Sequence, residues 1–477
     1  MSDTPNTSLA ADIISTDRDH IWHHLTPHNT LKNADPLIIT RGVGMHVTDI
    51  KGKEYLDATS GGVWSVNVGY GREKIANAVR DQLVEMCYFA NSAGSIPGAR
   101  FAEKLLHKMP EMAAGKGKGK GKGKGKGKGK VYYSNSGSEA NEKVYKMVRQ
   151  LAHINGDGRR HKIIFRDRDY HGSTIGALSS TGQIQRKEQY GPFAPGFSSF
   201  AHCCCYRCPF GKTYGSCDIE CAKDLETAIL REGPDQVGAV VLEPVTAGGG
   251  VIPPVPEYFP IIQQICKKYD VLLHIDEVVC GLGRTGKWFG YQHYGVKPDM
   301  VTMAKGLASG YAAISCTVTT DKVFDQFAAD DAGALGYFRD ISTFGGCTGG
   351  PAAGLANMEI IEEENLLDNV VAMGGHLQER LLELKDKYPV VGDVRGKGLF
   401  AGAELVADRD SKQPMSESYA MKIVAHCMAQ GVLIGRTNRS FHEFNNTLCL
   451  SPALIAKRGD IDNIADAIDA ALAANPL

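Results

Sequence analysis

Short apolar runs separated by amphipathic stretches recur along the middle of the chain. Residues 271–275 read Val-Leu-Leu-His-Ile and are followed by the acids Asp276 and Glu277. A nearly all-apolar run of this length is typical of a central parallel strand that is buried on both faces. Similar runs, with helical periodicity between several of them, lie near residues 131, 163, 238 and 301. The pattern predicts a wound α/β domain that binds its ligands at the carboxyl ends of the strands.

The flanking regions predict further elements. Alternation around Gly52 and Lys53 indicates a β-hairpin over 40–57, and residues 73–109 indicate two helices separated near 91–97. After residue 352 helical stretches alternate with apolar runs, which indicates a smaller α/β domain. A chain of 477 residues exceeds the size at which one core stops growing. We therefore expect an N-terminal segment that contributes to the small domain and the active-site entrance, a large domain and a C-terminal small domain: 1–75, 76–345 and 346–477.

Charge excludes some classes of partner. The net charge is −1, but the Gly-Lys repeats at 115–130 supply eight lysines, so the rest of the chain stands at −9. Such an acidic body does not favour nucleic acid or an anionic membrane. The repeats cannot form a packed core, and we expect a solvated insertion there. The alternative, a polyanion-binding tract, stays open.

Other features concern the compartment. The first 18 residues are polar, without the basic and apolar regions of a signal peptide, and we expect them to be loosely ordered. No apolar run is long enough to span a bilayer. The cysteine count is odd, at 13, and three of them are consecutive, which favours a reducing, cytoplasmic setting. Two close pairs could form a zinc knuckle, although their spacing favours no metal: Cys205, Cys208, Cys217 and Cys221.

One lysine carries the most specific chemistry. Lys305 stands alone in a segment of small and apolar residues just before Gly306. Loss of hydration favours its neutral amine, which can condense with an aldehyde. Asp276, at the end of a neighbouring strand, would suit a protonated pyridine nitrogen. The alternatives are a surface lysine and a helix-capping aspartate.

Further candidates flank other strands. The turn Ser136-Gly137-Ser138 precedes an amphipathic helix, whose N-terminal amides could bind a phosphate. Tyr170 and Glu243 each follow a predicted strand. The glycines at 281, 283 and 286 match a dinucleotide-binding pattern, but an aromatic, glycine-broken segment follows them, so nicotinamide binding is not expected.

These motifs occur in the order found in a known family. Asp276-Glu277-Val278, the glycines of 281–286 and Lys305-Gly306 resemble the signature of class III pyridoxal-phosphate aminotransferases. The resemblance extends from Trp22 to Ile455. It implies fold type I, with a large, mostly parallel sheet of the seven-stranded type and a smaller α/β domain, and pyridoxal 5'-phosphate as cofactor.

The resemblance also implies roles for individual residues. Lys305 would attach the cofactor and act as the catalytic base, while Asp276 would pair with the pyridine nitrogen. Val278 and Tyr170 would lie against the ring, and Trp64 would line the substrate pocket. Thr343, or else Thr348, would reach the phosphate of the cofactor bound in a neighbouring subunit, which implies a homodimer or a dimer of dimers. The remaining expected cofactor contacts are Ser136, Gly137, Ser138, His171 and Glu243.

The same resemblance indicates the substrates. Val279 and Cys280 stand where glutamate-using relatives carry glutamine and threonine, which points to the ω-amino-acid–pyruvate branch. Within that branch the whole chain is most similar to members that use taurine; β-alanine and diamines stay open, as does an aminomutase. Arg436, with Arg439 as the fallback, is expected to bind the acidic ends of pyruvate and of the amine donor.

Overall fold

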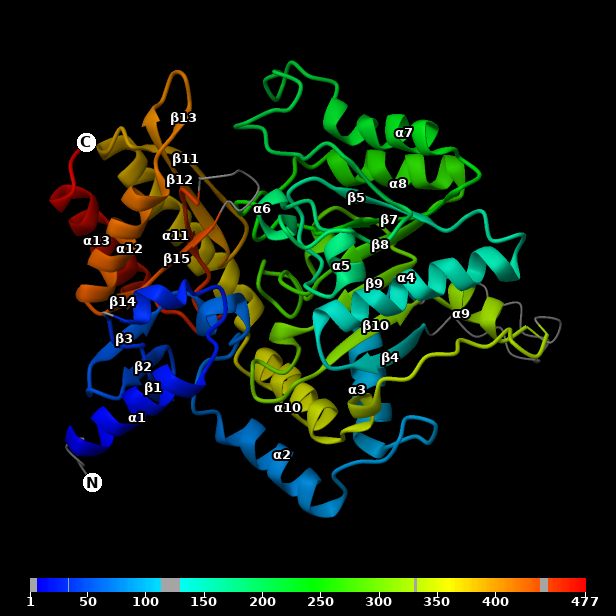
Figure 1. Ribbon diagram of the computed structural model, residues 1–477, viewed down its shortest axis with the longest axis horizontal. Helices are drawn as coiled ribbons and strands as arrows, with labels where there is room; N and C mark the ends of the chain where they lie inside the picture. Colours follow the sequence, from blue (N-terminus) through cyan, green and yellow to red (C-terminus); the bar gives the residue numbers. More distant parts are fainter. Residues whose placement is uncertain (1–6, 33, 113–128, 330–332, 438–444) are drawn as a thin grey trace.

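The computed structural model describes residues 7–32, 34–112, 129–329, 333–437 and 445–477. A large sheet with flanking helices forms one part, and two smaller sheets with their helices form the other (Figure 1). Within the described ranges, no helix combines the length and the apolar character that a bilayer span requires.

The large sheet has the strand order β4-β10-β9-β8-β7-β5-β6. β10 is antiparallel to both of its neighbours, while the other pairs in the sheet are parallel. The predicted sheet, mostly parallel and of seven strands, is therefore confirmed. Its strands are β4 (Lys130–Ser134), β5 (Lys162–Arg166), β6 (Phe197–Phe200), β7 (Val237–Leu242), β8 (Leu272–Asp276), β9 (Met300–Met303) and β10 (Ser315–Thr319).

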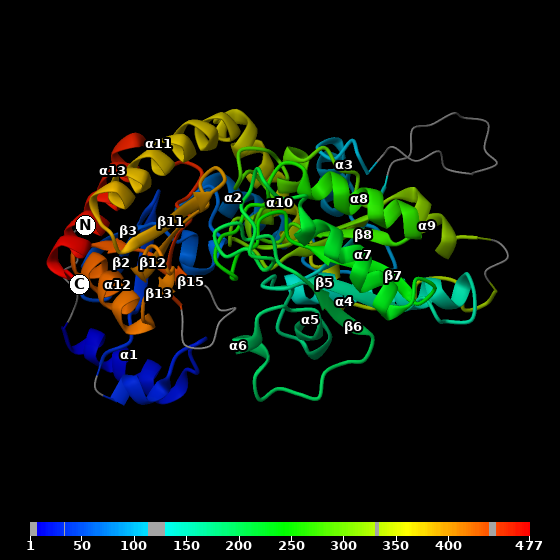
Figure 2. The same ribbon diagram turned by 90° about the horizontal axis from the view of Figure 1, so that it is seen from above.

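The central strands are buried because helices cover both faces of the sheet. Every residue of β7, β9 and β10 is buried, in agreement with the apolar runs of β7 and β9. Figures 1 and 2 place α7 and α8 on one face and α4 on the other. The helices that flank the sheet are α4 (Gly137–Ile154), α7 (Glu220–Glu232), α8 (Tyr258–Tyr269) and the short α5 (Ile175–Ser179), α6 (Ile184–Lys187) and α9 (Asp321–Phe327).

The smaller part joins both ends of the chain. The predicted hairpin is formed by β2 (His46–Asp49) and β3 (Glu54–Asp57), and β1 (Ile39–Val43) pairs with β2. β3 pairs in parallel with β14 (Val432–Leu433), so the N-terminal and C-terminal regions share one sheet. A second sheet has the order β11 (Val391–Gly396), β12 (Ala401–Asp408), β16 (Thr447–Leu450) and β15 (Gly435–Thr437), and the short β13 (Gln413–Pro414) pairs with β12.

Helices complete this part and connect it to the large sheet. The two helices expected over 73–109 are α2 (Glu73–Glu85) and α3 (Ile96–His107), and both pack against α10 (Gly349–Glu363). The remaining helices are α11 (Leu366–Lys387), α12 (Glu417–Ala429) and α13 (Arg458–Ala474).

The N-terminal expectation was wrong. We expected residues 1–18 to be loosely ordered, yet Thr7–His20 forms helix α1; residues 1–6 lie outside the described residues. The polar composition of this segment conceals one anchored position, because Ile14 is buried. Arg18 and His20 lie in the last turn, where positive charge stabilises the C-terminus of a helix.

Candidate active site

A cavity of about 130 Å³ lies at the carboxyl edge of the large sheet. It brings together nine of the twelve predicted site residues: Trp64, Gly137, Ser138, Tyr170, His171, Glu243, Asp276, Val278 and Lys305. Gly172, Ala247, Gly248, Val279 and Ala304 complete the lining. The contributing segments follow β5, β7, β8 and β9, which is where an α/β sheet places its ligands.

Asp276, the last residue of β8, is 2% exposed, and three donors hold its carboxylate. Oδ2 lies 2.8 Å from both Asn141 Nδ2 and His171 Nδ1, and Oδ1 accepts the Val278 N–H at 3.0 Å. Burial alone would raise the pKa of Asp276, but the hydrogen bond and charge of His171 lower it below its ordinary value. A fixed, ionised carboxylate therefore faces the cavity.

A second layer of hydrogen bonds supports Asn141. Its Oδ1 accepts from Thr302 Oγ1 at 2.8 Å, and Thr302 Oγ1 lies 3.0 Å from His274 Nε2. Because the Thr302 hydroxyl donates to Asn141, His274 must donate through Nε2. Burial lowers the pKa of His274 to about 3, so its ring is neutral. The chain of contacts runs from β8 through β9 and α4 back to Asp276.

Lys305 follows β9 and points into the cavity. Its Nζ lies 6.0 Å from the centroid of the Trp64 ring. Burial lowers the pKa of Lys305, while the charges of Asp276 and Glu243 oppose that change. Lys305 and Trp64 both have positive φ, 47° and 65°, a conformation that side chains other than glycine adopt at a cost. Two such residues facing one cavity indicate a site built for function.

The start of α4 provides a place for an anion. Ser136 caps the helix by accepting the Glu139 N–H at 3.2 Å, so it lies beside the cavity rather than in its lining. The first N–H groups of a helix have no partner within the helix, which suits a phosphate. A Cβ at Gly137 would come within 2.9 Å of Val278, so glycine is needed for the helix start to lie this close. The Ser138 hydroxyl accepts the Ser173 N–H at 3.0 Å and can still donate.

Glu243 fixes the loop that carries Tyr170. Its Oε1 accepts the Tyr170 N–H at 2.9 Å, and its Oε2 accepts the Ala247 N–H at 3.1 Å. Burial, together with the nearby charges of Asp169 and Asp276, raises the pKa of Glu243. The Glu243 carboxyl group therefore holds the backbone at Tyr170 and at Ala247 in place.

The two threonine candidates differ in exposure. Thr348 is buried, and its hydroxyl donates to the backbone oxygens of Met86 and Cys87. Thr343, at the start of a 3-10 turn (Thr343–Gly346), is exposed. Only Thr343 is therefore free to meet another molecule.

Arg436 lies on β15, outside the lining of the cavity. Its guanidinium forms an ion pair with Glu417, and Asn445 also donates to that carboxylate, at 2.9 Å. The fallback, Arg439, lies outside the described residues.

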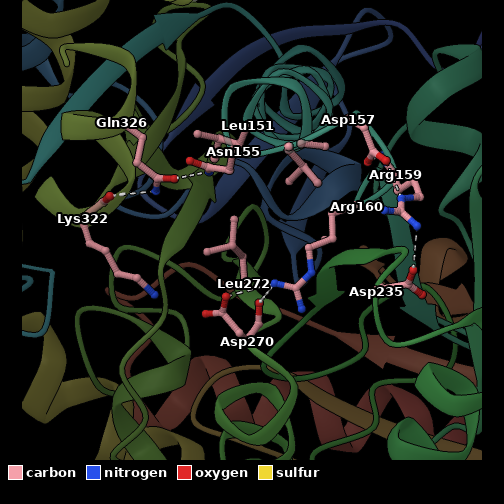
Figure 3. A pocket seen from close by; sticks show the side chains of 14 residues that line it. Leu151, Asn155, Asp157, Arg159, Arg160, Asp235, Asp270, Leu272, Lys322 and Gln326 are labelled. Carbon is pink, nitrogen blue, oxygen red and sulfur yellow. Dashed lines mark hydrogen bonds and ion pairs between the residues drawn. The ribbon is translucent and has the colours of Figure 1, made fainter. Parts of the chain in front are cut away.

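A larger cavity of about 400 Å³ lies at the opposite edge of the sheet, where β5, β7 and β8 begin (Figure 3). Its charges pair with one another: Arg159 with Asp157 at 2.6 Å, and Arg160 with Asp270 at 3.0 Å. Its lysine and its three carboxylates, Lys322, Asp157, Asp235 and Asp270, are all exposed, so this cavity is a less favourable place for catalysis than the first.

The described residues contain no group of three or more His, Cys, Asp or Glu side chains arranged to hold a metal ion. Each of the 13 cysteines is a free thiol. The cysteine-rich segment lines a small cavity of its own, with Cys205, Cys208, Cys217 and Cys221 among its walls.

Four residues that support or adjoin the site were not predicted from the sequence: Asn141, Thr302, His274 and Arg186. Asn141 lies one helical turn after Gly137, and His274 lies two residues before Asp276 on β8, so each shares a face with a predicted site residue. This spacing was a weak indication that both belong near the site.

Taken together, the sheet and the lysine–aspartate pocket define a pyridoxal-phosphate-dependent enzyme of fold type I. The family described as Aminotransferase class-III matches residues 29–472, and the chain belongs to it. The chain is 58% identical to the hypotaurine/taurine–pyruvate aminotransferase of Paracoccus denitrificans, over 98% of each chain. It is 57% identical to the taurine–pyruvate aminotransferase of Bilophila wadsworthia, over 97% of each. The crystal structure of a Bacillus anthracis aminotransferase has a TM-score of 0.90 and 36% identity, covering 98% of this chain and 100% of that one.

The predicted family, fold and cofactor are thereby confirmed: class III aminotransferases use pyridoxal 5'-phosphate. The residues present fit this group. A lysine with a lowered pKa faces the cavity beside an ionised carboxylate, and a helix N-terminus made close by Gly137 opens onto the same space.

Proposed function

We propose that the enzyme transfers the amino group of taurine to pyruvate, giving sulfoacetaldehyde and alanine. The proposal of transamination rests on Lys305 and Asp276, which line the same cavity. The relatives with 58% and 57% identity, both named for taurine and pyruvate, support the choice of substrates.

The bound cofactor would supply an aldehyde and an electron-accepting ring. The N–H groups of Gly137 and Ser138, with the Ser138 hydroxyl and Ser136 as cap, would hold its phosphate. Val278 and Tyr170 would pack against the ring.

Proton handling would fall to Lys305. Its lowered pKa favours the neutral amine, which can take a proton from the donor carbon that bears the amino group. Asp276 would keep a positive charge at the ring nitrogen, and His171 would orient Asp276 through their 2.8 Å contact. Glu243 would position Tyr170 through its backbone.

Substrate contacts would come from two sides. Trp64 packs edge-on against Phe400, with 5.6 Å between ring centroids, and would form an apolar wall. Arg436 stays a prediction as an anion-binding residue, since its guanidinium would have to leave Glu417 to reach a substrate.

We also propose that the active enzyme is a homodimer or a dimer of dimers. Ile341 and Phe344, on either side of Thr343, are 80% and 66% exposed. Apolar side chains of this size favour contact with another subunit, and Thr343 would then reach the neighbouring cofactor phosphate. Light scattering of the purified protein measures the assembly.

We also propose that the chain divides into three parts, with boundaries after residues 75 and 345, and that the enzyme is cytoplasmic. The 13 free thiols support a reducing compartment.

A donor screen with pyruvate, read out as alanine, tests the function. Taurine should be among the best donors, and sulfoacetaldehyde should appear in equal amount. If β-alanine or a diamine is the preferred donor, that compound replaces taurine in the proposed reaction. Product formation without pyruvate would indicate an aminomutase, and no turnover with any donor would refute transamination.

A further inference from the structure

An arginine outside the expected set lies beside the cavity. Arg186 is on α6, which lies on the side of the large domain that faces the small domain (Figures 1 and 2). Its guanidinium carbon lies 4.6 Å from the centroid of the Tyr170 ring, and Tyr170 lines the cavity. A planar guanidinium over an aromatic ring is held in place and still presents its N–H groups at the edge.

Among the described residues, no carboxylate forms an ion pair with Arg186. Its Nε donates to Gln183 Oε1 at 2.9 Å, and that amide is neutral. Gln183 is itself buried and donates to Arg168 O at 3.0 Å, so the contact is fixed. The two Nη groups make no hydrogen bond to any residue that the structure describes. Arg436 differs, because Glu417 already neutralises its charge.

The charge of Arg186 reaches the catalytic centre. Burial is the main cause of the lowered pKa of Lys305, and Arg186 lowers it further. Burial also lowers the pKa of Arg186 itself, while Tyr170 and Glu243 oppose that change. A guanidinium nevertheless stays protonated at neutral pH, and an uncompensated cation in a partly buried place favours an anionic ligand.

We propose that Arg186 binds the anionic end of the amine donor, a sulfonate or a carboxylate. The inference rests on the proposed function and assigns it a specificity-determining residue. A donor with its amine at Lys305 and its charge at Arg186 would span the Tyr170 side of the cavity. The two free Nη groups can each donate to one oxygen of the sulfonate or carboxylate.

The chain offers a matched control on the same helix. Lys187, the next residue, directs its Nζ toward the rings of Phe165 and Phe193, at 5.0 and 4.8 Å, and donates to Ser179 O. Lys187→Met therefore removes a neighbouring positive charge that does not touch the Tyr170 ring.

The experiment compares donors with and without a negative tail. For Arg186→Met, kcat/KM for taurine and β-alanine should fall by about 10- to 100-fold, the loss of a charge-assisted contact. For n-butylamine it should change by less than about threefold, and Arg186→Lys should recover part of the loss. Lys187→Met should resemble the wild type with all three donors. If Arg186→Met does not fold, Arg186→Gln takes its place, because the glutamine side chain can still form a hydrogen bond to Gln183.

A binding measurement separates this role from a structural one. Isethionate carries the sulfonate of taurine but a hydroxyl in place of its amine, so calorimetry can measure its binding without turnover. Its affinity for the holoenzyme should fall about tenfold or more in Arg186→Met and Arg186→Gln. Equal losses with charged and neutral donors, or unchanged isethionate binding, would overturn the proposal and leave Arg186 as a support for Tyr170. A wild-type enzyme that binds isethionate through Arg186 but does not use taurine would refute the proposed donor, not this contact.

Discussion

Asn141 holds the carboxylate of Asp276 from the helix side, and replacing it with alanine tests how the site keeps that carboxylate charged. Asn141→Ala removes one of three donors to Asp276 and leaves His171 and the Val278 N–H. A hydrogen bond to a charged group contributes about 1.5–3 kcal/mol. Losing this contact destabilises the ionised form, so the pKa of Asp276 should rise.

The direction of the pH effect follows from this change. In the wild type the pKa of Asp276 lies below its ordinary value, so its charge is present at neutral pH and is lost only as the pH falls through that lowered value. In Asn141→Ala the same loss occurs at higher pH. The carboxylate is still ionised at pH 7.5, so the affinity for pyridoxal phosphate, about tenfold weaker there, would reflect its looser position. The deficit should grow toward pH 5.5, where the charge begins to be lost.

Titration of the apoenzyme with pyridoxal phosphate, followed by absorbance between pH 5.5 and 8, measures the effect. The control is Asn369→Ala, which removes an asparagine whose Nδ2 donates to Leu454 O at 2.7 Å and to Ala456 O at 3.0 Å, away from the cavity. An affinity for Asn141→Ala within twofold of this control at every pH would refute the reasoning.

Four further outcomes are expected. Lys305→Ala should abolish turnover while pyridoxal phosphate still binds through its phosphate; turnover near wild type would end the transaminase assignment. Shortening 115–130 to a tight turn should leave kcat within about twofold, because the cost of closing a loop changes slowly with its length; loss of activity in a folded variant would make the tract functional. Thr343→Ala should weaken cofactor binding, whereas Thr348→Ala should lower thermal stability, and the reverse would exchange their roles. Arg436→Ala should raise KM for pyruvate and for taurine together, and unchanged KM values for both would exclude it.

The large sheet and the lysine–aspartate pair were predictable because their signals are local. β7 and β9 are apolar throughout apart from Thr302; Lys305 follows β9, and Asp276 ends the largely apolar β8. β6 and β10 were not predicted. Ser315–Thr319 contains three hydroxyl residues in five, and it is buried because it lies between β4 and β9. Its burial depends on strand order, which a local pattern does not contain.

The support of Asp276 was unpredictable for a related reason. Asn141, Thr302 and His274 belong to three different elements, and each has an ordinary local role. They meet only because β8 and β9 are neighbours and α4 crosses both, so that Thr302 pairs with Asp276 in the sheet register. Such a network follows from topology.

Arg186 and Arg436 show the same limit for electrostatics. Both side chains carry the same chemistry in the sequence. In the fold, Arg436 pairs with Glu417, 19 residues earlier, whereas Arg186 has an aromatic ring and a neutral amide as its contacts. Which arginine can bind a substrate anion therefore depends on which acids the fold places beside each one. Glu417 would have to be released at an energetic cost before Arg436 could bind a sulfonate, whereas Arg186 could bind one without breaking an ion pair.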